Sequence, residues 1–565
     1  MRSLCFFLGL VAIDASREAN LAPDSEGFHP IRIRIEYLDT SPVSETVRFV
    51  REVAAPHVSR LLSRVIQVSD RMQMLVIDAD KCNYPNFPAH LTGKGLRDTD
   101  LVAIIDMSTD FSEDSSTLMA TQTCQYDVIG RPQAGRIQIR NSWLSGQWKM
   151  ADQPVRENEI IEVLLHEFIH LLGFNSVAFA KFRRSGGPGA RYPPGEVSTI
   201  MYTCELDSVT KKPIVEWDVD PTFVEGLEEF TYFHTFYPGI LEAIDARGLK
   251  SSECRCPLDP GRKYTYEDIE YCIMHPNHCA IAIVTEKVVE KTREYFGCSS
   301  AKGMEIENGR DSRSCRLVLN DMHWKKRLVL GELMNYETHI RFNFLSPMTL
   351  ALLEDSGWYK VDYSVIPDPP VPGITWGHLK GCPFLFDKCV ESTGAVLDPD
   401  AFCSLENGYE MKCSKNALTI LQCTGAQIFE SDSAPPDQLI QYQYLAREKI
   451  FFRNHAHFDH CPVFSDASIY SCLDNDSQLP GISSPDSRCF MNTGGIALCL
   501  RAKCSPDGKS YIVQTVSGEK ISCTKAGGYM GSEGIVCQDP KIICSDVNGF
   551  HSLPGTITVP NADIK

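Results

Sequence analysis

Hydrophobic and polar residues alternate in several short stretches of the first third of the chain. Residues 31–38 (IRIRIEYL) alternate between apolar and charged side chains, which is typical of a half-exposed β-strand. Residues 44–66 instead repeat apolar side chains at helical spacing, and Pro56 predicts a new helical segment or a kink there. Further strand-like runs lie at residues 72–77, 101–107 and 135–141. The pattern predicts a region of mixed strands and helices.

The strongest helical pattern in the chain covers residues 157–172 (ENEIIEVLLHEFIHLL). Its apolar stripe consists of Ile161, Leu164, Leu165, Phe168 and Leu172. Gly173 is expected to end the helix, because glycine adopts the left-handed conformation at a helix C-terminus at little cost.

The rest of the chain divides into segments of different character. Residues 175–280 have weak periodicity and are interpreted as a long insertion. Regular patterns resume at residues 281–297 and 346–358. Residues 365–373 (VIPDPPVPG) predict a stiff linker, and the cysteines that crowd residues 382–544 predict a disulfide-stapled β domain.

Charge and cysteine content narrow the class of protein. The chain has 565 residues, with 55 Lys+Arg against 73 Asp+Glu and a net charge of −18, which argues against nucleic acid as the main partner. Cys5 stands alone, and the other 22 of the 23 cysteines lie between Cys82 and Cys544, an even number that allows eleven disulfides. Such a number is typical of an oxidising, extracellular compartment.

The N-terminal residues also indicate secretion. Arg2, the apolar run 4–13 and the small residue Ala15 match a signal peptide, with an artefactual N-terminus as the alternative. No other run is apolar enough to predict a transmembrane segment, and the polar C-terminus lacks a lipid-anchor signal. We expect a secreted, extracellular protein, and membrane association stays open.

The motif with clear chemistry lies inside the predicted helix. His166 and His170 are four positions apart, so their imidazoles share one helix face and reach a single metal ion. Zinc suits neutral nitrogen ligands and lowers the pKa of a bound water to about 7. Glu167 is then placed to accept a proton from this water and pass it to a leaving amine. Such motifs also arise by chance, but the helical context favours a metal site.

A catalytic zinc site needs a third protein ligand. In the compact metzincin pattern a histidine follows the glycine by three residues, but Ser176 occupies that position. A distant segment must therefore supply the ligand. The best candidate is His323, and eleven positions later Met334 is the candidate for a methionine turn beneath the metal.

These segments resemble leishmanolysin-type metallopeptidases of the metzincin clan, and the animal members called invadolysins most of all. The similar segments are HEFIHLLGF, REYFGC, MHWKKRLVLGELMNYE, SPMTLALLEDSGWY and CQYDVIGRPQAGRIQI, together with the cysteine-rich tail. The resemblance runs from about residue 30 to about residue 545. It implies a zinc peptidase in which His323 is the third ligand and Met334 the turn methionine.

The chain departs from that family in two places. His323 lies 153 positions after His170, farther than in the protozoan members, and residues 175–280 hold most of the excess and are a candidate cover for the cleft. The family usually also has a propeptide cysteine that occupies the zinc until activation. No cysteine stands between Ser16 and residue 31, so either latency is lost or part of the natural N-terminus is missing.

Other motifs compete for a metal role. Residues 454–460 (NHAHFDH) match the HxHxDH pattern of metallo-β-lactamase-like hydrolases, but they lie in a disulfide-dense region without βα units, which favours a structural segment. Residues 272–279 (CIMHPNHC) resemble zinc-finger ligands, although disulfides are more common at this cysteine density. Tyr295 is expected to pack, and Glu332 either orients a ligand or is a solvated turn carboxylate.

Together these patterns predict a secreted zinc endopeptidase of the α+β class that acts on proteins or peptides, with extracellular matrix or host proteins as candidates. One Zn²⁺ per chain is expected on His166, His170 and His323, with Glu167 as the catalytic residue. The expected parts are a signal peptide (1–15), a metzincin-type catalytic subdomain with a twisted sheet and the active-site helix (28–174), an insertion (175–280), a central subdomain (281–364) and a disulfide-rich, mostly β C-terminal domain (374–565). The alternative is a non-catalytic binding or adhesion protein that retains the fold.

Overall fold

The computed structural model describes the chain from residue 27 to residue 544, with gaps. The described ranges are 27–38, 44–69, 74–82, 87–93, 95–108, 117–147, 153–179, 181–183, 201–206, 213–216, 241–245, 279–310, 317–335, 344–365, 376–387, 389, 395–403, 411–414, 417–424, 458, 461–465, 471–473 and 479–544. They fall into two compact units, the first holding the described residues up to 183 with 344–365, and the second the remainder. The expected signal peptide, most of the expected insertion and residues 366–373 of the expected linker lie outside the described residues.

A four-stranded sheet forms the centre of the first unit. The strands β2 (Ile33–Leu38), β4 (Leu101–Asp106) and β6 (Pro132–Ile139) are parallel, and β5 (Met119–Tyr126) is antiparallel to β6 at one edge. All residues of β4 and β6 are buried, as is typical of parallel strands that are covered on both faces. The strand runs predicted at 101–107 and 135–141 are thus confirmed.

The half-exposed pattern predicted at residues 31–38 holds at Arg32 and Arg34, whose side chains are 33 % and 39 % exposed, but it is wrong at Glu36, which is buried. Nearly every residue of β2 is buried. The charged side chains that suggested a solvent face are instead paired, because Arg34 Nε donates to Glu36 Oε1 at 2.7 Å and the Arg32 guanidinium bonds Asp100. Ion pairing allows this charged pattern to occupy a covered strand.

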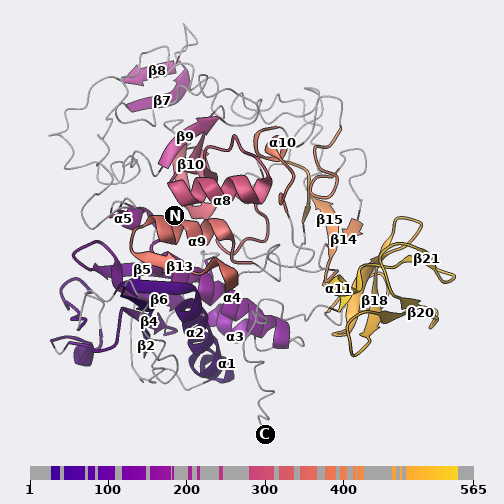
Figure 1. The fold of residues 1–565 in the computed structure, drawn as a ribbon, viewed down its shortest axis with the longest axis horizontal. Coiled ribbons are helices and arrows are strands. Elements are labelled where there is room, and N and C mark those ends of the chain that lie inside the picture. Colours follow the sequence, from indigo (N-terminus) through magenta and orange to yellow (C-terminus); the bar gives the residue numbers. More distant parts are fainter. Residues whose placement is uncertain are drawn as a thin grey trace. The chain divides into compact units, whose positions relative to one another are not determined.

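Helices pack against this sheet, as Figure 1 shows. The segment α1 (Glu45–Phe49), a π-helical η1 (Val50–Ala54) and α2 (Ala55–Val65) follow one another directly, and Pro56 lies in the first turn of α2 as predicted. The long α4 (Gln153–Leu172) packs on β5 and β6 and beside α2. A Cβ atom at Gly135 of β6 would lie 2.4 Å from Leu171 Cδ1, so the glycine allows α4 to approach the sheet closely.

Shorter elements complete the first unit. They are the three-stranded antiparallel sheet β1 (Phe28–Pro30), β3 (Ile66–Ser69) and β13 (Tyr359–Val361), and the helical segments η2 (Ala89–Leu91), α3 (Asn141–Gln147), α5 (Ser176–Phe179), α9 (Pro347–Asp355) and η4 (Tyr363–Val365). The strand predicted at residues 72–77 is not a strand in its described part, which forms only isolated bridges at Leu75 and Ile77. The pattern at 346–358 corresponds to α9, and Ser346 caps its start.

The second unit begins with antiparallel strands. The four-stranded sheet has the order β12-β11-β10-β9, formed by β9 (Leu241–Asp245), β10 (Cys279–Ile283), β11 (Met304–Arg310) and β12 (Leu317–Trp324), and β7 (Met201–Leu206) pairs with β8 (Pro213–Glu216). The helix α8 (Glu286–Phe296) follows β10 and ends at Gly297, whose φ is 67°. Just beyond it, Cys298 forms a disulfide with Cys382 at the start of α10 (Cys382–Phe386).

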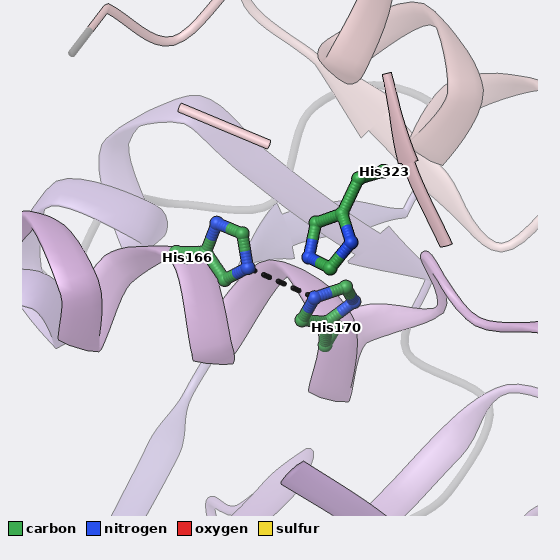
Figure 2. A group of neighbouring side chains, drawn as sticks. All are labelled: His166, His170 and His323. Atoms are coloured by element: carbon green, nitrogen blue, oxygen red, sulfur yellow. Dashed lines mark hydrogen bonds between the residues drawn. The ribbon is translucent and has the colours of Figure 1, made fainter. Parts of the chain in front are cut away.

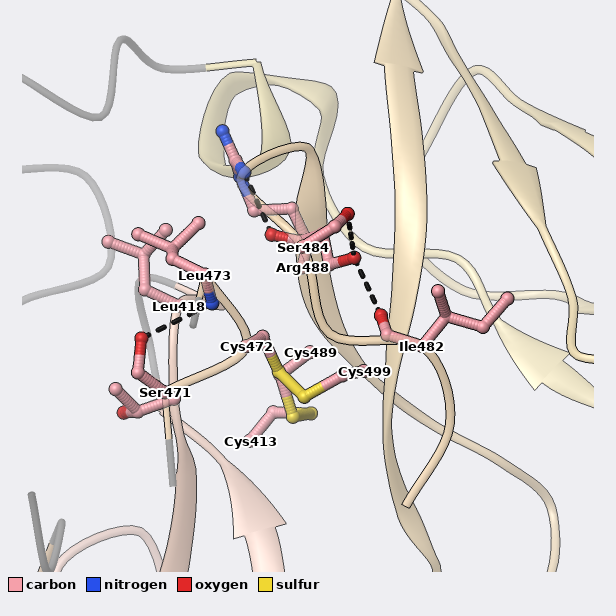
Figure 3. Close-up of a disulfide and its surroundings, with 12 residues drawn as sticks. Cys413, Leu418, Ser471, Cys472, Leu473, Ile482, Ser484, Arg488, Cys489 and Cys499 are labelled. Atoms are coloured by element: carbon pink, nitrogen blue, oxygen red, sulfur yellow. Dashed lines mark hydrogen bonds between the residues drawn. A yellow bond between two sulfur atoms is a disulfide. The ribbon is translucent and has the colours of Figure 1, made fainter. Parts of the chain in front are cut away.

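The C-terminal part of the second unit is mostly β and rich in disulfides. Its strands are β14 (Met411–Cys413), β15 (Ile420–Thr424), β16 (Val463–Ser465), β17 (Ser487–Met491), β18 (Ala497–Cys504), β19 (Tyr511–Gln514), β20 (Lys520–Cys523), β21 (Tyr529–Met530) and β22 (Ile535–Val536), and α11 (Pro540–Ile543) follows them. Cys489 of β17 lies opposite Cys499 of β18, yet each is bonded elsewhere, to Cys413 and to Cys472 (Figure 3). The hairpin therefore holds two other segments by neighbouring cross-links.

The described residues hold eight disulfides, of which the others are Cys82–Cys124, Cys389–Cys461, Cys403–Cys423, Cys504–Cys544 and Cys523–Cys537. This number agrees with an extracellular or secreted protein. Within the described part of the chain, the helical stretch Glu159–Phe179 is long and apolar enough to cross a membrane, but its most apolar window is 82 % buried inside the protein. The core helix of a folded domain meets the same criteria. The mixture of helices, strands and disulfides confirms an α+β protein.

Candidate metal centre

Two histidines of α4 present ring nitrogens to the same point. His166 is buried and His170 is half-buried, and their Nε2 atoms face each other at 3.0 Å. Two nitrogen ligands at about 2.0–2.1 Å from a tetrahedral zinc are about 3.3 Å apart. The helical spacing of four residues therefore brings both imidazoles to the separation that a shared metal ion requires.

The second nitrogen of His170 sets the state of its ring. Nδ1 donates to the carbonyl oxygen of Phe174 at 2.7 Å, so in the neutral ring the lone pair is on Nε2, the atom that faces His166. Burial lowers the pKa of His170 to about 4, although the bond to Phe174 opposes this shift. The ring is therefore neutral near pH 7, which is the form that binds a metal.

The end of α4 positions that carbonyl. Gly173 follows the last helical residue with a φ of 133°, and its amide donates to His170 O at 3.1 Å while Phe174 N donates to Ile169 O at 3.2 Å. Asn175 Nδ2 also donates to His170 O at 2.9 Å. A Cβ atom at residue 173 would lie 3.0 Å from the Trp358 ring, so both backbone conformation and space require glycine.

Glu167 lies on α4 between the two histidines and is buried. Its Oε2 accepts a hydrogen bond from the hydroxyl of Thr121 on β5 at 2.6 Å. Burial raises the pKa of Glu167 to about 7, and the bond from Thr121 partly offsets this rise. A carboxyl group with such a pKa can both accept and donate a proton near neutrality. Thr121 was missed from the sequence, although the turn at residues 127–130 could have indicated a hairpin that includes its strand.

His323 lies near the end of β12 in the second unit. The next residue, Trp324, donates its amide to the carbonyl of Met334 at 2.9 Å, and Met334 is fully buried. The Glu332 carboxylate accepts a hydrogen bond from the Met334 amide and is itself fully buried. The interpretation of Glu332 as a solvated carboxylate is therefore wrong, because it serves as an internal acceptor for the turn.

The three predicted histidines form one group. One ring nitrogen each of His166, His170 and His323 lies within 4.8 Å of the others (Figure 2). Among the described residues, this is the one group of three histidine, cysteine or carboxylate side chains with the spacing of a metal site. Neutral imidazoles in such a group suit zinc.

The two other candidate metal motifs lie mostly outside the described residues. Apart from the buried Phe458, residues 454–460 lie outside the described residues, and so do residues 272–278. Cys461, which follows the first motif, forms a disulfide with Cys389, in keeping with a disulfide-stapled segment. Tyr295 is buried and donates its hydroxyl to Trp376 O at 2.9 Å, which supports a packing role.

Two histidines one helical turn apart with a glutamate after the first, and a distant third histidine near them, are the residue pattern of HExxH metallopeptidases. The family model of leishmanolysin matches residues 49–186 and 268–546, which is more than half of the chain. The chain therefore belongs to the leishmanolysin family of zinc-dependent metallopeptidases, and the predicted resemblance is confirmed.

Individual relatives are similar at low identity. A leishmanolysin-like peptidase of Caenorhabditis elegans is 28 % identical over 318 residues, which cover 55 % of this chain and 38 % of the relative. A leishmanolysin-like peptidase of Drosophila melanogaster is 26 % identical over 341 residues, which cover 59 % of this chain and 41 % of the relative. Leishmanolysin of Leishmania donovani is 23 % identical over 487 residues, with 83 % of this chain and 63 % of the relative covered. The chain thus spans less than two thirds of the length of these relatives.

Proposed function

We propose that this protein is a secreted zinc-dependent endopeptidase that hydrolyses peptide bonds in proteins. The observation that carries the proposal is that one ring nitrogen each of three histidines lies within 4.8 Å of the others. The buried Glu167 lies in the sequence between two of these histidines, His166 and His170. Membership of the leishmanolysin family supports the same chemistry.

His166, His170 and His323 are the proposed ligands of one zinc ion per chain. The fit rests on the donors: the Nε2 atoms of His166 and His170 face each other at 3.0 Å, and the Phe174 carbonyl fixes the His170 tautomer that binds a cation. Zinc held there would supply a water of lowered pKa and a positive charge beside the scissile carbonyl oxygen. Met334, buried and bonded to Trp324, is proposed to support His323 from the turn.

Glu167 is the proposed general base. Its carboxylate accepts a proton from the attacking water and then donates that proton to the leaving amine. A single buried carboxyl with a pKa near 7 suits both steps, because neither protonation state is strongly disfavoured. Gly173 ends the helix so that the Phe174 carbonyl can hold His170.

The domain arrangement belongs to the proposal as well. We assign residues 28–174 to a metzincin-type catalytic subdomain, 175–280 to an insertion, 281–364 to a central subdomain with His323 and 374–565 to a C-terminal domain. Protein or peptide substrates follow from the peptidase class, and extracellular matrix or host proteins are candidates. Secretion after removal of residues 1–15 is supported by the disulfide content.

Metal content and proteolysis test the proposal together. The full chain, expressed by secretion and loaded with zinc, is expected to bind one zinc ion and to cleave an unfolded protein. Glu167→Gln should abolish cleavage and retain zinc, whereas His323→Ala should lose zinc or bind it weakly. Glu159→Gln, on the same helix and half-buried, is the matched control.

The alternative is a binding or adhesion protein that keeps the fold without cleaving. It would be favoured if the zinc-loaded wild type cleaves no unfolded protein. A hydrolase centred on residues 454–460 would instead be indicated if replacement of His455, His457 and His460 removes activity while Glu167→Gln leaves it intact.

A further inference from the structure

The hydroxyl of Thr121 contacts Glu167 at two places. Its Oγ1 donates to the carboxylate Oε2 at 2.6 Å, and it lies within donating distance, 3.1 Å, of the main-chain carbonyl oxygen of the same residue. A threonine hydroxyl has one hydrogen and two lone pairs, so it donates to one of these oxygens at a time. Two alternative acceptors on one residue give this hydroxyl two satisfied orientations.

The surrounding elements fix where the hydroxyl lies. Thr121 pairs with Ile137 in the ladder of β5 and β6, and Thr123, on the same face, pairs with Gly135. A Cβ atom at Gly135 would lie 2.4 Å from Leu171 Cδ1 of α4 and 2.6 Å from Gln122 O of β5. The Leu171 side chain of α4 therefore lies directly against the β6 backbone beside β5, so the helix that carries Glu167 packs closely on the strand pair that carries Thr121.

We propose that Thr121 is a positioning residue for catalysis, which holds the Glu167 carboxyl group in one orientation throughout the proton transfers. While Glu167 is a carboxylate, the hydroxyl donates to Oε2 and leaves Oε1 for the water. Once Oε1 has accepted the water's proton, Oε2 is the carbonyl oxygen of the carboxylic acid and still accepts from the hydroxyl, so the protonated Oε1 keeps its orientation toward the leaving amine. Within Glu167 and Thr121, the shuttled proton on Oε1 is the only atom that changes its bonding. This inference rests on the proposed role of Glu167 as general base.

The test separates the hydroxyl from the shape of the side chain. Thr121→Val removes the hydroxyl and keeps the volume, Thr121→Ser keeps the hydroxyl and removes a methyl group, and Thr123→Val is the control on the same face of β5. For each variant of the full chain, kcat and KM on an unfolded protein substrate are measured with zinc content and thermal unfolding. We expect Thr121→Val to lower kcat about ten- to a hundredfold, the loss typical of a hydrogen bond to a charged group, with KM and zinc content unchanged. Thr121→Ser should recover most of kcat.

The kcat values of these variants decide whether the Thr121 hydroxyl positions Glu167. The inference is overturned if Thr121→Val keeps the kcat of Thr123→Val, or if Thr121→Ser loses as much kcat as Thr121→Val, which would indicate packing of the methyl group. If Thr121→Val does not fold, Thr121→Ser against Thr121→Ala makes the same comparison in smaller side chains. A failure of the proposed function looks different, because either the zinc-loaded wild type would cleave no unfolded protein or Glu167→Gln would retain the wild-type cleavage.

Discussion

The amide of Trp324 donates a hydrogen bond to the carbonyl oxygen of Met334 at 2.9 Å. This bond joins the end of β12, next to His323, to the turn that contains Met334. The Glu332 carboxylate accepts a hydrogen bond from the Met334 amide in the same turn. Both main-chain polar groups of a buried methionine are thereby satisfied, and the position of His323 depends on the same turn.

Removal of the Glu332 carboxylate should destabilise this turn. Glu332→Ala leaves the buried Met334 amide without its acceptor, and we expect the free energy of unfolding to fall by about 1–3 kcal/mol or more. Glu332→Gln retains an acceptor and should cost less. Chemical denaturation measures both. Glu294, whose side chain is 58 % exposed, is the control, and its alanine variant should change stability by less than about 0.5 kcal/mol. Equal effects at both glutamates would contradict the internal role of Glu332.

Alanine at Gly173 should be more costly than alanine at an open glycine of positive φ. Gly173 has a φ of 133° and a Cβ position 3.0 Å from Trp358, whereas Gly495 has a φ of 77° and nothing within 4 Å. Backbone strain alone costs about 1–2 kcal/mol. We expect Gly173→Ala to exceed Gly495→Ala in loss of unfolding free energy and also to weaken zinc binding, because Phe174 O moves. Thermal unfolding and metal titration measure the two effects. An equal loss of unfolding free energy for both glycine variants would contradict a steric role of Trp358 at residue 173.

The metal-free protein should lose stability as pH rises through the range in which Glu167 titrates. Burial raises the folded-state pKa from 4.5 to about 7, so the folded protein holds the proton more tightly than the unfolded chain does. The associated stability is fully present below pH 4.5 and lost as pH rises to about 7, up to about 3 kcal/mol in all. Unfolding free energies of the metal-free wild type and Glu167→Gln at pH 4.5 and pH 8 measure this term. Parallel pH profiles of the two proteins would exclude it.

The two neighbouring disulfides on the β17–β18 hairpin should differ in their contribution. Cys413–Cys489 closes a separation of 76 residues and Cys472–Cys499 one of 27. In the chain-entropy description, the longer loop stabilises by about 1 kcal/mol more. Paired alanine replacements of each bridge, compared by chemical denaturation, should show this order. The reverse order would mean that contacts near Cys472, rather than loop closure, dominate.

The sequence predicts the part of the site that depends on local geometry. Helical spacing places His166 and His170 on one face, and Gly173 marks the end of the helix, because both effects act within a few residues. His323 was different: nothing in local periodicity connects residues 153 positions apart, and it was selected by its spacing to Met334 and by the resemblance to a family. Thr121 could not be found, because its contact with Glu167 depends on how β5 and α4 pack.

The fold shows the same division. Runs that match a single element, such as α4 and β4, agree with their patterns. The alternation at residues 31–38 misled on the exposure of Glu36, which is buried because the half-exposed Arg34 pairs with its carboxylate. Residues 72–77 have the composition of a strand, but their described part finds only isolated bridge partners at Leu75 and Ile77. Strand formation depends on a partner chain segment, which composition does not reveal.

The disulfide between Cys298 and Cys382 has a consequence for how damage to this protein would be seen. It closes a covalent ring over a sequence separation of 84 residues, and that ring includes His323 and Met334. A single peptide-bond cut anywhere inside the ring leaves both pieces joined through sulfur. A preparation nicked there would migrate as a full-length chain on a non-reducing gel, and its fragments would separate only after reduction.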